Sequence, residues 1–324
     1  MLDQIKFGVH IPVMGFDGKG PTREEIISLA QYAESLKYDS LSVNDHIVFH
    51  NSWLDAISTL SALATSTARI LIGTSILNIV VRNPVVCAKA LAAIDILSSG
   101  RLFAGVGPGS LQGDYDVCGI DFSERWPRFS EALQVLVMLL SNDNGGTAPL
   151  NYEGTYYILK DVLLTPKPVQ KPHPPIYVGS WGSDTTLKMA AKHSNGWMAS
   201  AYNITPEKFK EKWNFLLAYR KSLGKGKKEE EEGETFDNCV VSMFGYIDDD
   251  KGKVRKLVKE ILSPTLRRPA EELEQMLLFG SLDECLHKIR NFVDAGVKRI
   301  HFWPVLDYRD QICVFKNAIS TEFL

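Results

Sequence analysis

The feature that most constrains the fold is an alternation of helix and buried strand, clearest between residues 83 and 109. Asn83 can cap a helix, and Pro84 suits the first helical position because its missing N–H is not needed there. Gly100 can supply the left-handed conformation that ends a helix. Residues 102–106 are then apolar on both faces, as in a parallel strand covered by helices. This segment predicts one helix and one strand of a parallel α/β fold.

The apolar positions of this helix also predict which of its faces is buried. Val85, Ala88 and Leu91 fall at helical spacing, so the face that carries them is expected to pack on the strands. Lys89 and Asp95 are expected to lie off that face.

The same alternation extends over the whole chain, and a capping box of Thr22 and Glu25 predicts the start of its first helix. Eight strands with crossover-length connections favour a (β/α)8 TIM barrel over an open doubly wound sheet. Such a barrel typically takes about 250 residues, so residues 1–324 are expected to form a single domain. The strands are expected at residues 5–12, 40–44, 70–76, 101–106, 175–179, 196–199, 239–247 and 297–304.

Two segments interrupt the alternation and are interpreted as insertions. Residues 142–174 contain five prolines and an Asn-Asp-Asn-Gly-Gly run, which predict a loop with a short hairpin. Residues 251–279 predict a polar helical insertion over the mouth of the barrel. Residues 225–234 are rich in lysine and glutamate, and we expect a solvated loop there.

Composition narrows the classes of partner and compartment. The net charge is −3, which disfavours nucleic acid because no basic surplus exists to neutralise phosphates. The five cysteines form no Cys-x-x-Cys pair and the N-terminus has no signal pattern, so a cytoplasmic protein is expected. The most apolar region, residues 70–81, is too short to span a membrane. The histidines show no metal-binding spacing, so no metal is expected.

In a barrel of this kind the active site lies at the carboxyl ends of the strands. Asp45 and His46 follow the second predicted strand and offer an ionisable pair near neutral pH. The alternative is structural, with Asp45 capping a turn and His46 packed beneath a loop.

Two glycine-rich turns also follow strands. Gly107 and Gly109 would let a flat ligand approach the backbone closely. The other turn precedes a helix, so its open N–H groups and hydroxyls predict a phosphate site, with an ordinary serine-capped turn as the alternative. This second turn consists of Gly179, Ser180, Trp181, Gly182 and Ser183.

These features resemble those of the bacterial luciferase-like flavin-dependent oxidoreductases, whose members use reduced FMN or the deazaflavin coenzyme F420. Residues 83–109 are similar to the family's pattern of Pro, apolar helix, Leu-Ser-x-Gly-Arg-Leu and Gly-Val-Gly. Asp45-His46 resembles the Asp-His of the deazaflavin-using branch. The resemblance implies that residues 180–183 hold the cofactor phosphate. It also aligns Ser75 and Ile76 with a non-proline cis peptide behind the ring.

Two departures from the family pattern shape the functional hypothesis. Ser110 stands where some deazaflavin-dependent dehydrogenases carry a glutamate acid, and Gly113 replaces a cofactor-contacting asparagine. We therefore favour a monooxygenase that uses reduced FMN, from a separate flavin reductase, and dioxygen on a small organic substrate. His46 would act as acid or base, with Asp45 fixing its ring. The substrate pocket is expected to include His10, Trp53, Ser110 and Arg267.

Three other functions stay open. One is a deazaflavin (F420)-dependent hydride-transfer oxidoreductase of the same fold. Another is a non-catalytic flavin-binding protein, and the third is a barrel lyase or isomerase acting on a phosphorylated substrate. A homodimer is expected in each case.

Overall fold

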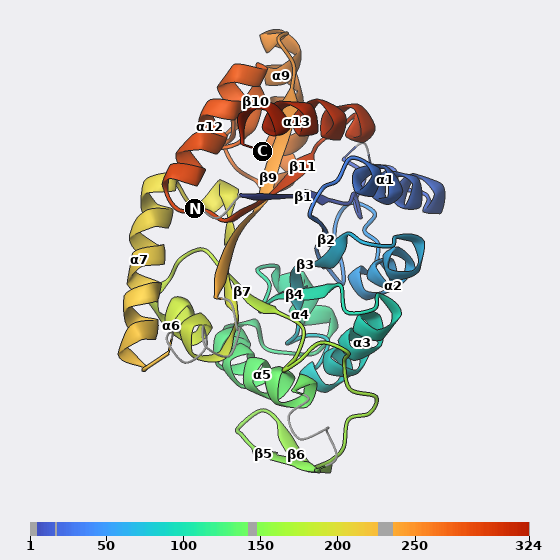
Figure 1. The fold of residues 1–324 in the computed structure, drawn as a ribbon, viewed down its shortest axis with the longest axis vertical. Helices are drawn as coiled ribbons and strands as arrows, with labels where there is room; N and C mark the ends of the chain where they lie inside the picture. The colour runs from blue at the N-terminus through green and yellow to red at the C-terminus, as the bar shows by residue number, and fades with distance from the viewer. Residues whose placement is uncertain (1–4, 17, 142–147, 226–235, 324) are drawn as a thin grey trace.

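The computed structural model describes residues 5–16, 18–141, 148–225 and 236–323. Eight parallel strands close into a barrel, because β9 pairs with β8 on one side and with β11 on the other. Figure 1 shows the strands at the centre and the helices around them. The predicted (β/α)8 barrel is confirmed. Its strands are β1 (Lys6–His10), β2 (Ser40–Val43), β3 (Leu71–Asn78), β4 (Leu102–Gly107), β7 (Ile176–Ser180), β8 (Gly196–Ser200), β9 (Asp237–Ile247) and β11 (Arg299–Pro304).

Local sequence signals place the ends of the outer helices. Thr22 and Glu25 form the predicted capping box at the first helix, and Asn83 accepts the Val85 N–H at the start of the third. Gly100 has the expected positive φ of 79°. The helices that surround the barrel are α1 (Arg23–Ser35), α2 (Ala56–Ser66), α3 (Pro84–Leu97), α5 (Arg125–Leu140), α6 (Asp184–His193), α7 (Pro206–Ser222), α12 (Leu282–Asp294) and α13 (Tyr308–Glu322).

Asp95 on α3 corrects one prediction. Its side chain is fully buried rather than turned away from the packed face. One carboxylate oxygen accepts the backbone N–H groups of Val169 and Gln170, at 2.7 and 3.0 Å, and the other accepts the Gln170 side-chain amide at 2.7 Å. The carboxylate therefore holds the last part of the first insertion against α3, and its partners lie about 75 residues away in the chain.

Both insertions are present. The first contains an antiparallel hairpin of β5 (Leu150–Glu153) and β6 (Ile158–Val162), while residues 142–147 lie outside the described part. The second is helical as predicted, but its last strand pairs with the end of β9. Residues 226–235 of the charged run also lie outside the described residues. The second insertion consists of α9 (Lys251–Leu257), the π-helical turn η4 (Val258–Leu262), α10 (Ser263–Leu266), α11 (Ala270–Met276) and β10 (Leu278–Gly280).

A third irregular segment joins β4 to α5, and the helical turns within it were not predicted. It contains the short helix α4 (Gln112–Val117) and the 3-10 turn η1 (Phe122–Glu124). This segment supplies several residues of the site described below. Among the helices of the described residues, none has both the length and the apolar character needed to cross a membrane.

Candidate functional site

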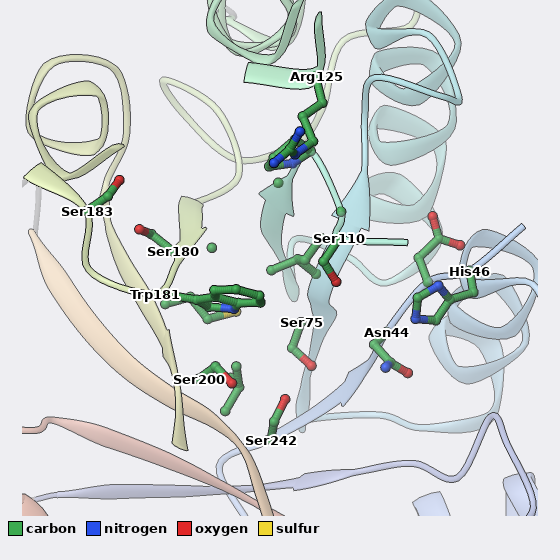
Figure 2. A pocket seen from close by; sticks show the side chains of 18 of the residues that line it. Asn44, His46, Ser75, Ser110, Arg125, Ser180, Trp181, Ser183, Ser200 and Ser242 are labelled. Carbon is green, nitrogen blue, oxygen red and sulfur yellow. The ribbon is translucent and has the colours of Figure 1, made fainter. Parts of the chain in front are cut away.

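A cavity of about 480 Å³ opens at the carboxyl ends of the barrel strands (Figure 2). This volume is in the range of pockets that hold small molecules and cofactors. Most of the site residues predicted from sequence line it. They are Asp45, His46, Ser75, Ile76, Gly107, Gly109, Ser110, Gly179, Ser180, Trp181 and Ser183.

The back of the cavity is built where β3 is irregular. The Ser75–Ile76 peptide bond is cis, as the resemblance implied, and the pairing of β3 with β4 shifts register after Ser75. The Ile76 side chain lies against two glycines. A Cβ added at Gly107 would be 3.1 Å from Ile76 Cδ1, and one added at Gly179 would be 2.5 Å from Ile76 Cγ2. These glycines therefore make room for Ile76, whereas the sequence had suggested close approach of a ligand at Gly107.

The turn between β7 and α6 forms one end of the cavity. Ser183 caps α6 by accepting the Thr186 N–H, and Ser180 Oγ accepts the Gly182 N–H at 3.0 Å. Gly182 does not line the cavity, but its φ of 92° lets the turn form. Both serine hydroxyls line the cavity beside the positive end of a ten-residue helix, so the turn can bind an anion.

His46 lies at the opposite side of the cavity and is held by a residue that sequence reasoning missed. Its Nδ1 is 2.9 Å from Oδ2 of Asp114 on α4. Oδ1 of Asp114 accepts the N–H groups of Ile47 and Val48, at 2.8 and 2.9 Å. The rings of Trp53 and His46 pack in a T-shaped arrangement, with 4.6 Å between their centroids. The ring of His46 is therefore held in one orientation.

Asp45 does not take the predicted role beside His46. Its carboxylate forms a two-point ion pair with Arg82, with N–O distances of 2.6 and 2.7 Å, and Arg82 also reaches Asp55 at 2.6 Å. Asp45 and His46 lie beyond the end of β2, in a segment without strand structure, and their side chains have different partners. The expected contact between Asp45 and His46 is replaced by two separate pairs, Asp45–Arg82 and His46–Asp114.

Three of the residues expected in the substrate pocket lie outside the cavity lining. His10 is fully buried, stacks on Trp303 at 3.5 Å between ring centroids, and has its pKa lowered by burial to about 3. Trp53 packs behind His46. Arg267 is exposed at the end of α10, where its backbone has a φ of 54°.

The lining also contains residues that were not predicted. Arg125, at the start of α5, donates to the Phe122 carbonyl at 3.0 Å and lies over the Phe122 ring. Its segment gave no sequence signal. Ser242 lies inside a strand that the sequence predicts as continuous. In the structure, the pairing of β9 with β11 shifts register there and Ser242 has a positive φ, so its side chain lines the cavity. The remaining lining residues are Asn44, Pro108, Phe122, Arg125, Trp126, Met198, Ser200, Tyr202, Val241 and Ser242.

The lining suits a flat cofactor with a polar ring and a phosphate. Ser75 Oγ is buried at the wall and has no hydrogen-bond partner among the described residues, so a ligand atom can satisfy it. Ser180 and Ser183 supply the anion end. Within the described part of the chain, no group of three or more His, Cys, Asp or Glu side chains is placed to hold a metal ion.

Comparison with known proteins defines the class. The model of a family described as luciferase-like monooxygenase matches residues 5–262. The chain belongs to this family, and it is a luciferase-like oxidoreductase.

Several relatives carry the name F420-dependent glucose-6-phosphate dehydrogenase. The one from Microbacterium testaceum is 27% identical over 305 residues, which cover 86% of each protein. The one from Gordonia bronchialis is 24% identical over 331 residues, which cover 93% of this chain and 92% of the relative.

Solved structures share the fold. An F420-dependent secondary alcohol dehydrogenase in complex with an F420–acetone adduct has a TM-score of 0.82 at 20% identity and covers 98% of both chains. A monooxygenase from Streptomyces bottropensis has a TM-score of 0.83 at 20% identity, covering 99% of this chain and all of the other.

Proposed function

We propose that this oxidoreductase uses a deazaflavin coenzyme and transfers hydride between it and an uncharged alcohol or carbonyl compound. The relatives that align with most of the chain are named for dependence on F420, which supports a deazaflavin over FMN. The observation that carries the proposal is His46 on the cavity wall, held by Asp114. Oxidation of an alcohol by hydride transfer needs a base for the hydroxyl proton, and a fixed imidazole suits that task.

The residues of the cavity divide the work between them. When bound, the deazaflavin supplies the hydride acceptor for the alcohol. Ser180 and Ser183 would bind its phosphate at the positive end of α6. Ile76 would support the ring, and Ser75 would give its unpartnered hydroxyl to a polar ring atom. His46 would accept the hydroxyl proton at the ring nitrogen that is not bound to Asp114.

The proposed substrate carries no phosphate. Among the described residues that line the cavity, Arg125 is the only lysine or arginine. Figure 2 draws Arg125, Ser180 and Ser183 in the upper half of the view. The wall around the β8 and β9 ends is apolar or hydroxylic, as at Met198 and Ser242. Because Arg125 is the one cation among these lining residues, the proposal favours an uncharged substrate over glucose 6-phosphate.

The test measures binding first and turnover second. The protein is titrated with F420 and with FMN by fluorescence quenching, and the F420 complex is then mixed with 2-propanol, cyclohexanol or glucose 6-phosphate. We expect F420 to bind at micromolar concentration or below, and the alcohols alone to bleach the oxidised deazaflavin. Tight FMN binding without F420 binding would contradict the proposal.

A second candidate is a monooxygenase that uses reduced FMN and a separate flavin reductase. It is favoured by Ser110, because the cavity wall holds no carboxylate acid at that position, and Asp45 is engaged by Arg82. Its test is oxygen uptake by the protein with reduced FMN, set against a protein-free control. Oxygen uptake that depends on the protein would favour this candidate over hydride transfer.

A further inference from the structure

The two oxygens of the Asp114 carboxylate have different partners, and this arrangement constrains the proton of His46. The carboxylate is buried, with 2% of its side chain exposed, against 19% for His46. Oδ1 accepts two backbone N–H groups, and Oδ2 faces His46 Nδ1. An ionised carboxylate only accepts hydrogen bonds, so the proton of this contact belongs to Nδ1. In the neutral imidazole, Nε2 then carries a free lone pair.

The surroundings of His46 direct that lone pair. His46 lines the cavity (Figure 2) whereas Asp114 does not, so Nε2 is the ring nitrogen left free for a ligand there. Phe49 and Trp53 pack on the ring at 4.9 and 4.6 Å and limit its rotation. The neighbouring charged groups are already paired, since Asp45 and Asp55 both bind Arg82. His50 is separated from the ring by Phe49, on which it packs at 4.1 Å.

We propose that Asp114 is the positioning residue of the site: it holds His46 as the Nδ1-protonated tautomer and so makes Nε2 the proton acceptor that faces the substrate. In alcohol oxidation, the O–H proton passes to Nε2, the C–H hydride passes to the cofactor, and a carbonyl product remains. Asp114 then stabilises the imidazolium. The reaction direction rests on the proposed function, whereas the tautomer does not.

The first experiment needs no cofactor. Long-range 1H–15N correlation spectra of the 15N-labelled protein report the tautomer of each histidine, and His46→Gln identifies the His46 signals. We expect wild-type His46 to be Nδ1-protonated at pH 8. A wild-type His46 that carries its proton on Nε2 would overturn the proposal without any variant of Asp114.

The second experiment inverts the contact. In Asp114→Asn, the amide oxygen can keep the two backbone N–H bonds while the NH2 group donates to Nδ1, so His46 should switch to the Nε2-protonated form. The exposed Asp116 lies on the same short helix, and Asp116→Asn is the matched control, with no change expected. An Asp114→Asn protein with native near-UV circular dichroism and an unchanged tautomer would refute the assignment.

The third experiment measures whether the tautomer of His46 affects turnover. With F420 and the best alcohol, Asp114→Asn should lower kcat by about 100-fold or more, as expected for loss of general-base catalysis, with the Kd of F420 unchanged. Asp116→Asn should retain wild-type kcat. A switched tautomer with undiminished kcat would remove Asp114 from the reaction. If wild-type protein binds F420 but oxidises no alcohol, the proposed function fails while the tautomer result stands.

Discussion

The two ends of the cavity are held together by different kinds of contact. At the end where we propose that the cofactor phosphate binds (the phosphate end), Ser180 and Ser183 bond to residues two and three positions away. At the His46 end, the partners come from distant segments: Asp114 is 68 residues from His46, and Arg82 is 37 residues from Asp45. The first end is therefore a local turn, whereas the second is a junction of three chain segments that depends on buried charge. Substitutions should affect ligand binding at the phosphate end and folding stability at the His46 end.

The largest effect is expected from breaking the buried ion pair. Asp45→Asn removes one partner of Arg82 in a site where the Asp45 side chain is fully buried, and should cost about 3 kcal/mol of unfolding free energy. Asp55→Asn is the control, because Asp55 is 39% exposed and asparagine still caps α2; it should cost about 1 kcal/mol or less. Urea unfolding measures both. Equal losses would mean that burial does not distinguish the two carboxylates.

Acidic pH should lower the unfolding free energy of the protein through the buried His10. The pKa of His10 falls from 6.5 to about 3 because the ring is buried. Its stabilising contribution is present above pH 6.5 and is lost as the pH falls toward 3, because the unfolded chain binds the proton first. By pH 5 this group alone should lower the unfolding free energy by about 2 kcal/mol. His10→Phe should flatten the acid slope, and exposed His287→Gln should leave it unchanged.

The contact between Ile76 and Gly179 joins the two ends and can be tested by overpacking. Gly179→Ala would place Cβ 2.5 Å from Ile76 Cγ2, so Ile76 must move, at a cost of about 1–3 kcal/mol and with weaker cofactor binding. Ile76→Ala in the same protein should restore part of the loss. Gly113→Ala is the control, since its Cβ would lie at an ordinary 3.5 Å from Val48. If Gly179→Ala changed neither the unfolding free energy nor cofactor binding, Ile76 would not be held in one position.

The smallest effect on folding is expected at the phosphate end. Ser180→Ala should weaken binding of the phosphate-bearing cofactor by about 1–3 kcal/mol and leave binding of its form without the phosphate unchanged. Ser183→Ala should do the same, and it also removes the cap of α6. Thr205→Ala removes the cap of α7 and controls for that loss. Fluorescence titration gives the affinities. Parallel losses for both cofactor forms would rule out a phosphate site here.

Much of the fold and half of the site could be predicted because their signals are short-range. The phosphate turn is five consecutive residues, and its capping serine bonds within one helical turn. The partner of His46 could not be predicted in this way. Asp45 is the carboxylate next to it in the chain, but Asp45 binds Arg82, and His46 pairs with Asp114 on an unpredicted helix.

The sequence by itself determined the alternation of helix and strand, the caps at Thr22, Asn83 and Ser183, and the two glycine turns. These features depend on contacts within a few residues, where backbone geometry leaves few choices. Only the tertiary structure decided the burial of Asp95 and the pairing of Asp114 with His46. A buried carboxylate needs donors from wherever the fold brings them, and barrel closure brings together segments that are dozens of residues apart.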